Sequence, residues 1–233
     1  MSRLIESPER VGMSTKRLGR IAKAMQRYIE NGSVRGISTM VLRKGDLVHA
    51  EQVGCRDVEG GLEMTSDTIF RIYSMTKPVV STALMILYEE GLFQLEDPVA
   101  KYIPAFGSTR VLAADGVLED QIRPMTVSDL LTHTSGLTYD FMEDTPAGQL
   151  YRDARIMNDA SVSLEDVIEA LAAIPLASQP GSRWHYSVGI DVAARLVEVL
   201  SGDSLRLFLK ERMFDPLRMM DTDFGVDERD LGR

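Results

Sequence analysis

This sequence contains little from which a disulfide, a metal site or a cofactor site could be built. Its single cysteine, Cys55, excludes an internal disulfide. The three histidines, His49, His133 and His185, lie far apart and lack the close spacing to other His or Cys residues that zinc sites use. No phosphate-binding glycine loop is present. We therefore predict that the protein uses no metal and no cofactor.

The sequence also lacks an excess of basic residues and any long apolar run. Its 26 Lys and Arg residues are outnumbered by 35 Asp and Glu residues, and the net charge of -9 disfavours binding to a nucleic-acid backbone. No apolar run approaches the roughly 18 residues that a membrane span requires. Residues 1–10 lack the apolar middle of a secretory signal. We expect a cytoplasmic globular protein that binds neither nucleic acid nor a membrane.

Few segments have the pattern of a β-strand. Residues 36–43 and 47–53 are rich in β-branched and apolar side chains, and the turn-like residues 44–46 join them into a hairpin. Ahead of this hairpin, Ser14 is a candidate N-cap for an amphipathic helix that ends near Asn31. A sheet of only two strands is marginally stable and has exposed edges. We therefore expect strands from outside this chain to complete the sheet.

From residue 75 onward the pattern is mainly helical. Residues 75–90 have the composition of a strongly apolar helix, which Gly91 ends. Thr126 and Asp129 have the spacing of a capping box at the start of another helix. Three further helices are expected, over residues 163–174, 187–200 and 204–213.

Ser74 and Lys77 form the first candidate catalytic pair. Residues three apart share one face of a helix, so the Ser74 hydroxyl and the Lys77 amine can meet at the start of the apolar helix. A Ser-x-x-Lys match arises by chance about once in a chain of this length, and the alternative is an N-cap serine beside a solvated lysine. The apolar context favours a catalytic role, because burial would lower the pKa of Lys77 and so favour the neutral amine that a base requires.

Tyr186 is the second candidate, just ahead of a predicted helix. A tyrosine beside a loop more often has a structural role, through packing and hydrogen bonding. To act as a base, its pKa must move from about 10 toward 7, which requires about 4 kcal/mol of differential stabilisation. Lys77 is the candidate source of that stabilisation. Lys77 and Tyr186 would then share the proton taken from Ser74.

His133 raises a competing Ser-His interpretation. It follows a predicted helix end and precedes Gly136, a pattern typical of a C-cap or a loop, and we favour that structural role. The sequence has no Gly-x-Ser-x-Gly motif, so an α/β-hydrolase has no support. The residues point to acyl transfer at Ser74.

Three segments in this order, residues 70–78, 130–137 and 180–187, resemble the serine β-lactamase-like superfamily. The similarity is greatest to the family VIII carboxylesterases, relatives of class C β-lactamases. The resemblance implies an α+β fold of the β-lactamase/transpeptidase type, in which an antiparallel sheet flanked by helices joins a mostly helical lobe. It also implies that Ser74 is the acylated nucleophile, that Lys77 is its partner base and that Tyr186 assists proton transfer.

The resemblance covers essentially the whole chain, and it implies that residues 1–233 are the N-terminal portion of a single domain. Residues 1–72 would form a helix and hairpin of the α/β lobe, and residues 73–200 would form the mainly helical lobe. Residues 201–233 would form a helix and the start of the chain's return to the α/β lobe. The family normally continues well beyond this point, with further strands and a second oxyanion donor. We expect an incomplete sheet, a nearly inactive isolated chain, and a partner chain as one source of the C-terminal half.

Val188 stands where the family's Tyr-x-Asn motif has asparagine. Valine cannot hydrogen-bond a substrate amide, which disfavours a β-lactamase. The expected function is a serine carboxylesterase that acts on a small-molecule ester through an acyl-serine intermediate. Hydrolysis of β-lactams or D-amino-acid peptides and acyl transfer stay open as alternatives, as does a non-catalytic homologue that serves as a binding module.

Overall fold

The chain folds into two compact units. A computed structural model describes residues 7–113, 115–142, 146–156 and 161–233. We call the unit formed by residues 1–71 and 225–233 the hairpin unit, and the unit formed by residues 72–224 the helical unit. The expectation that both belong to a single domain stays a prediction.

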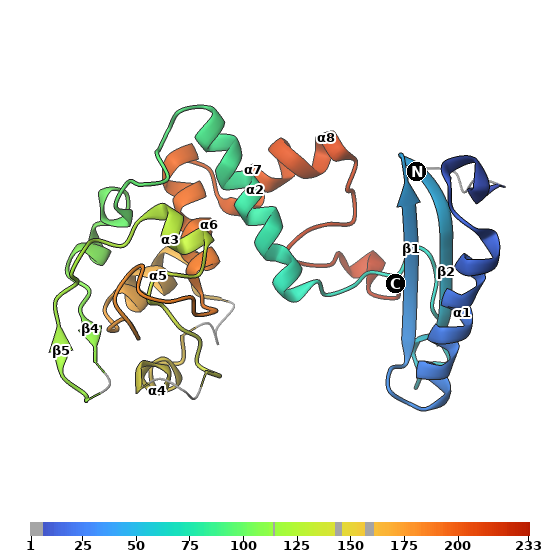
Figure 1. Cartoon of the computed structure of the whole chain (residues 1–233), viewed down its shortest axis with the longest axis horizontal. Coiled ribbons are helices and arrows are strands. Elements are labelled where there is room, and N and C mark those ends of the chain that lie inside the picture. The colour runs from blue at the N-terminus through green and yellow to red at the C-terminus, as the bar shows by residue number, and fades with distance from the viewer. Residues whose placement is uncertain (1–6, 114, 143–145, 157–160) are drawn as a thin grey trace. The chain divides into compact units, whose positions relative to one another are not determined.

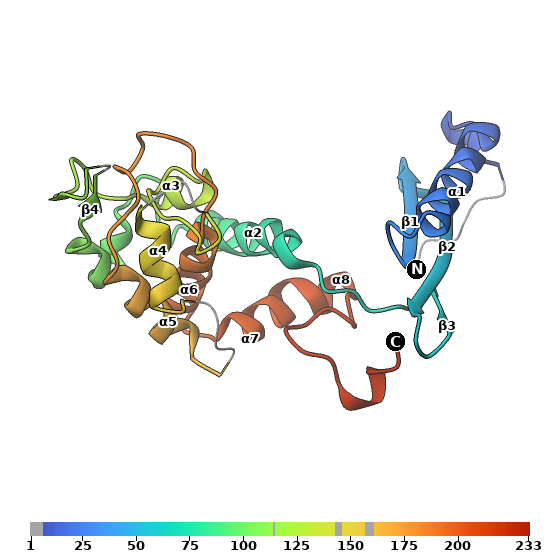
Figure 2. The same cartoon turned by 90° about the horizontal axis from the view of Figure 1, so that it is seen from below.

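The hairpin unit is built on one antiparallel pair of strands. β1 (Gly36–Arg43) pairs with β2 (Asp46–Asp57), and the short β3 (Leu62–Glu63) pairs with the other edge of β2. α1 (Thr15–Glu30) runs beside the hairpin in both views (Figures 1 and 2). The predicted helix and hairpin are confirmed, and β2 continues four residues past Val53, where it pairs with β3.

Local signals set the limits of α1, and its core is small. The Ser14 side chain accepts a hydrogen bond from the Arg17 N–H at 3.4 Å, as expected of an N-cap. The helix ends at Glu30, directly before Asn31 and Gly32. The buried cluster of this unit consists of Val11, Leu18 and Val48.

The helical unit contains most of the helices. Its elements are α2 (Thr76–Glu89), β4 (Val111–Leu112), β5 (Leu118–Glu119), α3 (Val127–Leu131), α4 (Pro146–Asp153), α5 (Leu164–Ala172), α6 (Gly189–Ser201), α7 (Leu205–Leu209) and α8 (Asp215–Leu217). β4 and β5 form a small antiparallel pair that was not predicted, because two-residue strands are too short to show an alternating pattern. The helix expected over residues 204–213 is α-helical only in α7 and continues as a π-helix over Lys210–Phe214.

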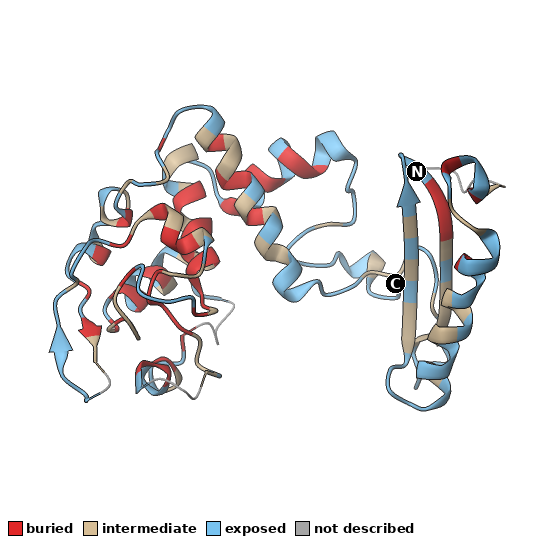
Figure 3. Cartoon of the chain, in the orientation of Figure 1, coloured by how far each residue is buried: buried red, intermediate tan, exposed pale blue. Residues whose placement is uncertain are grey.

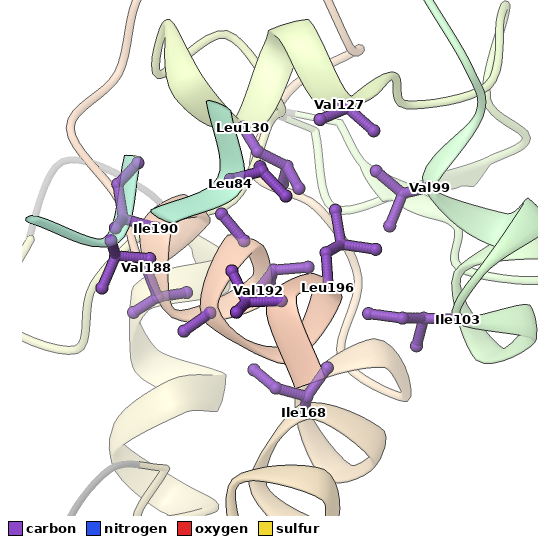
Figure 4. Packing of buried hydrophobic residues seen from close by; sticks show 14 of the residues in the cluster. Leu84, Val99, Ile103, Val127, Leu130, Ile168, Val188, Ile190, Val192 and Leu196 are labelled. Atoms are coloured by element: carbon purple, nitrogen blue, oxygen red, sulfur yellow. The ribbon is translucent and has the colours of Figure 1, made fainter. Parts of the chain in front are cut away.

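α2, α3 and α6 surround the core of the helical unit. Leu84 from α2, Leu130 from α3 and Leu196 from α6 are fully buried, and Figure 4 shows these side chains gathered around α6. Burying one such leucine contributes about 1.5–3 kcal/mol. The predicted capping box is confirmed at the start of α3. In the described residues, none of the helices combines the length and the apolar content needed to cross a bilayer.

Candidate active site

Ser74 lies in a single 3₁₀ turn, Tyr73–Met75, that leads directly into α2. The backbone of Tyr73 has a φ of 44°, in the left-handed region where a bulky residue costs about 1–3 kcal/mol. Ser74 thus lies just ahead of the N-terminus of α2 with an exposed side chain, and Lys77 lies in the first turn of the helix. The predicted helical placement of both residues is confirmed.

Two side chains meet the hydroxyl oxygen of Ser74. The Tyr186 hydroxyl donates a hydrogen bond to Ser74 Oγ at 2.7 Å, and Lys77 Nζ donates to the same oxygen at 3.4 Å. Lys77 Nζ also lies 4.7 Å from the centre of the Tyr186 ring. The structure therefore brings the three predicted residues together, although 112 positions separate Ser74 from Tyr186.

Tyr139 is a fourth member of the site, and sequence reasoning missed it. Lys77 Nζ donates to the Tyr139 hydroxyl at 2.9 Å. The Tyr139 ring lies 5.4 Å from the Tyr186 ring between centroids, and Phe141 stacks on it at 4.7 Å. The only signal in the sequence was its place two residues after the segment 130–137.

Lys77 is held in its charged form. Burial lowers its pKa, but the hydrogen bonds with Tyr139 and Tyr186 outweigh burial, so the pKa of Lys77 is raised above its ordinary value. The prediction that burial would favour the neutral amine is therefore wrong, because it weighed burial alone and did not include Tyr139.

The two tyrosines bound to Lys77 differ in their acidity. Hydrogen bonding with Lys77 and with Ser74 lowers the pKa of Tyr186. Burial raises the pKa of Tyr139, despite its hydrogen bond to the same ammonium. Of the two phenols, Tyr186 is thus the better suited to lose its proton and act as a base.

The loop over residues 180–188 is fastened to the segment that follows α3. The Gly181 N–H donates to the Thr134 carbonyl and the His185 N–H donates to the His133 carbonyl, both at 2.7 Å. Gly181 has a φ of 78°, and a Cβ there would lie 2.0 Å from a neighbouring guanidinium, so a larger residue would be strained. These contacts fix the approach of Tyr186 to the nucleophile.

His133 has the structural role that its sequence context predicted. It follows the C-cap residue of α3 with a φ of 57°, and its Nδ1 accepts a hydrogen bond from the Ser187 N–H at 3.3 Å. Its ring packs on that of Tyr186 with 4.8 Å between centroids. Among the described contacts none joins His133 to Ser74. The Ser-His alternative therefore has no geometric support.

Val188 does not face the nucleophile. It is the residue preceding α6, it is only 1% exposed, and Figure 4 shows it among the core side chains. Because the Val188 side chain is apolar and buried in the core, it offers no hydrogen-bonding group to a bound substrate.

A cavity of about 500 Å³ opens beside Ser74 and Lys77. Its size is within the range of about 300–1,000 Å³ that is typical of small-molecule sites. Its apolar lining residues are Val80, Leu164, Ile190, Ala194, Leu205 and Phe224, and polar side chains line the rest. Across the described ranges, no three His, Cys, Asp or Glu side chains are grouped so that they could hold a metal ion.

Comparisons with known proteins agree on one family. The family model described as Beta-lactamase matches residues 21–233. Protein Rv1367c of Mycobacterium tuberculosis is 36% identical over 207 residues, which cover 87% of this chain and 51% of that protein. Esterase EstB of Burkholderia gladioli is 35% identical over 193 residues, which cover 81% of this chain and 47% of that protein. The chain spans about half the length of these curated relatives.

A solved structure shows the same fold. EstCE1, described as a hydrolase with promiscuous acyltransferase activity, superposes with a TM-score of 0.75 at 31% identity. The match covers 86% of this chain and 51% of that structure.

Proposed function

This chain belongs to the beta-lactamase family, and on that premise we propose that it is a serine carboxylesterase, which hydrolyses small acyl esters through an acyl-Ser74 intermediate. Its fold is the α+β fold of β-lactamase- and transpeptidase-like proteins, with small antiparallel sheets. One observation carries the proposal: Tyr186 and Lys77 both donate hydrogen bonds to Ser74 Oγ. Nucleophilic catalysis requires a base within hydrogen-bond reach of the serine, and the Tyr186 oxygen, 2.7 Å from Ser74 Oγ, becomes that base once its own proton is lost.

In the acylation step, the Tyr186 phenolate takes the Ser74 proton as Ser74 Oγ attacks the ester carbonyl carbon. Negative charge moves onto the carbonyl oxygen, where the Ser74 N–H and the N-terminal end of α2 stabilise it. The bond between the carbonyl carbon and the alcohol oxygen then breaks, and the Tyr186 hydroxyl gives its proton to the departing oxygen. The products are acyl-Ser74, a free alcohol and the phenolate.

In the deacylation step, water attacks the acyl carbonyl carbon and Tyr186 takes a proton from the water. The tetrahedral adduct expels Ser74 Oγ, which recovers the proton from Tyr186, and a carboxylic acid leaves. Lys77 stays charged throughout, held by Tyr139, and stabilises the phenolate between the two steps. This role gives the raised pKa of Lys77 a function, because a neutral amine would not stabilise the phenolate.

Acyl transfer is a second candidate function. An alcohol in place of water would attack acyl-Ser74 with the same proton transfers. The two reactions differ only in whether water or an alcohol attacks the acyl carbonyl carbon. The description of EstCE1 as a hydrolase with acyltransferase activity favours keeping this candidate.

We further propose that the chain alone turns esters over slowly. The resemblance places the second oxyanion donor outside residues 1–233, and removing one such donor costs about a hundred- to a thousandfold in rate. The remaining half would come from a longer protein or, as an alternative, from a second chain.

A fluorophosphonate probe and p-nitrophenyl butyrate test these proposals. We expect a probe adduct that maps to Ser74, is lost in Ser74→Ala and is kept in Ser33→Ala, an exposed serine of the hairpin unit. We expect ester turnover to rise when the C-terminal half of EstB is joined to the chain, and p-nitrophenyl butyrate to be preferred over nitrocefin. Robust turnover by the chain alone would contradict its proposed dependence on that half. Absence of any adduct, with or without the added half, would favour the non-catalytic binding module.

A further inference from the structure

Asp191 differs from the other charged residues that line the active-site cavity. Lys77, Glu198 and Arg206 also line it. Lys77 is bonded to Tyr139, as described above. Within the described part of the chain, Asp191 has no hydrogen bond or ion pair except with its own backbone N–H, although the charge of Lys77 acts on its carboxylate.

The other two charged groups are engaged in structural contacts. Glu198 accepts hydrogen bonds from Arg195 at 3.1 Å and from the Leu205 N–H at 2.9 Å, which ties α6 to the start of α7. Arg206 donates to both carboxylate oxygens of Asp223, at 2.7 and 2.6 Å. Neither side chain is therefore free to serve a ligand without breaking a bond of the fold.

Asp191 lies in the first turn of α6, between the buried residues Ile190 and Val192. Its side chain is partly buried in the largely apolar wall of the cavity, and burial raises the pKa of this carboxyl. A carboxylate without a partner in such surroundings is energetically unfavourable. A carboxyl perturbed by burial inside a cleft is a candidate functional residue.

We propose that Asp191 is a specificity-determining residue, which accepts a hydrogen bond from a hydroxyl or a protonated amine on the substrate chain that fills this cavity. The inference rests on the proposed function and narrows it to esters whose apolar chain carries a hydrogen-bond donor. The apolar lining binds the apolar part of the substrate by burial, and Asp191 gives the cavity a carboxylate that no other side chain hydrogen-bonds. A substrate whose chain carries no hydrogen-bond donor would bury the Asp191 carboxylate without a partner. Such a substrate should therefore bind to the cavity with lower affinity.

Binding to Ser74→Ala tests the proposal without requiring turnover. The ligands are p-nitrophenyl esters of equal acyl length whose chains end in a methyl group, a hydroxyl or a protonated amine. We expect calorimetry to give about tenfold tighter binding of the two donor-bearing esters than of the methyl-ended ester, as for a hydrogen bond to a charged group. A second substitution, Asp191→Leu, should abolish the difference. Asp191→Asn should reduce it for the amine and retain part of it for the hydroxyl.

One control variant keeps the outcomes distinct. Asp203→Asn changes an exposed carboxylate outside the cavity and should leave all three affinities unchanged. Equal binding of the three esters would overturn the proposal. So would an Asp191→Asn enzyme that loses kcat equally on all three substrates with KM unchanged, since that result assigns Asp191 to positioning Lys77. If donor-bearing esters bind tightly but Ser74 never forms an adduct, only the proposed function fails.

Discussion

The two units of this chain differ in how far they cover their own apolar residues. In the helical unit, Leu84, Leu130 and Leu196 are 0% exposed. In the hairpin unit, two apolar residues of β1, Met40 and Leu42, are 63% and 52% exposed. Figure 3 shows the contrast: buried residues concentrate on α2, α3 and α6, whereas β1 is coloured as exposed or intermediate along its length.

This difference indicates where the geometry of the candidate site comes from. Ser74, Lys77, Tyr139 and Tyr186 all belong to the helical unit, which has a contiguous core of its own. Their mutual distances are therefore set by packing within that unit. The hairpin unit contributes no side chain to the contacts described among them. The comparison can be tested by matched substitutions in the two units.

The largest effect is expected from Tyr186→Phe. Removing the phenolic oxygen removes the proton acceptor closest to Ser74 Oγ, and the rate of Ser74 labelling by a fluorophosphonate should fall by about a thousandfold. The matched control is Tyr28→Phe in α1, whose side chain is 50% exposed, and labelling should be unchanged. If both substitutions slowed labelling equally, the residues required for labelling would not all lie in the helical unit.

Core substitutions should separate the units next. Leu84→Ala leaves a cavity in a fully buried position and should lower the free energy of unfolding by about 3 kcal/mol. Leu18→Ala removes the same atoms from a small, partly solvated cluster and should cost less, about 2 kcal/mol. The single tryptophan, Trp184, lies in the helical unit, so its fluorescence during urea unfolding should shift for Leu84→Ala only. A shift of the Trp184 transition by Leu18→Ala would show that the units unfold together.

The pH dependence of labelling gives a smaller but diagnostic effect. Tyr186 has a pKa lowered from 10.0, and only its phenolate accepts the proton, so the rate should rise about tenfold per pH unit until that pKa is passed. Lys77 has a pKa raised from 10.5, so the rate should fall only at higher pH, where the ammonium is lost. Measured profiles of the intact chain and of Tyr186→Phe check this prediction. A rise that persists without the phenol would assign it to another group.

The smallest effect is expected for Met40→Ser on β1. Its exposed side chain makes little difference to the folded chain, and the free energy of unfolding should change by less than about 0.5 kcal/mol. Thermal unfolding measures the change in stability. The contrasting variant is Val80→Ser at a buried position of α2, which should be strongly destabilised. A large loss for Met40→Ser would mean that the strand surface is covered in solution.

Local patterns predicted much of the fold and three members of the site. The caps at Ser14 and Thr126 fixed two helix starts, because a hydroxyl at that position satisfies an otherwise unpaired N–H. The Ser74–Lys77 spacing predicted their contact, since it depends only on helix geometry. Tyr186 was found through its motif context and not through spacing.

What could not be predicted depends on contacts between distant segments. Tyr139 reaches Lys77 across 62 positions, and nothing in its neighbours marks it as a partner of an amine. The charge state of Lys77 was misjudged for the same reason, because an apolar sequence indicates burial but does not show that the Tyr139 phenol approaches the amine. The lack of a partner for Asp191 likewise emerges only once every neighbour is placed.

The His133 imidazole, which packs on the Tyr186 ring, stabilises the loop that carries Tyr186 only above a certain pH. His133 Nδ1 can accept the Ser187 N–H only while it is unprotonated, and burial lowers the pKa of His133 below 6.5. The stabilisation from this neutral ring is fully present above pH 6.5, where the unfolded chain is also neutral, and it is lost as the pH falls toward the folded-state pKa. Mild acidification should therefore loosen the loop that carries Tyr186, while Ser74 in its 3₁₀ turn and Lys77 on α2 stay in place.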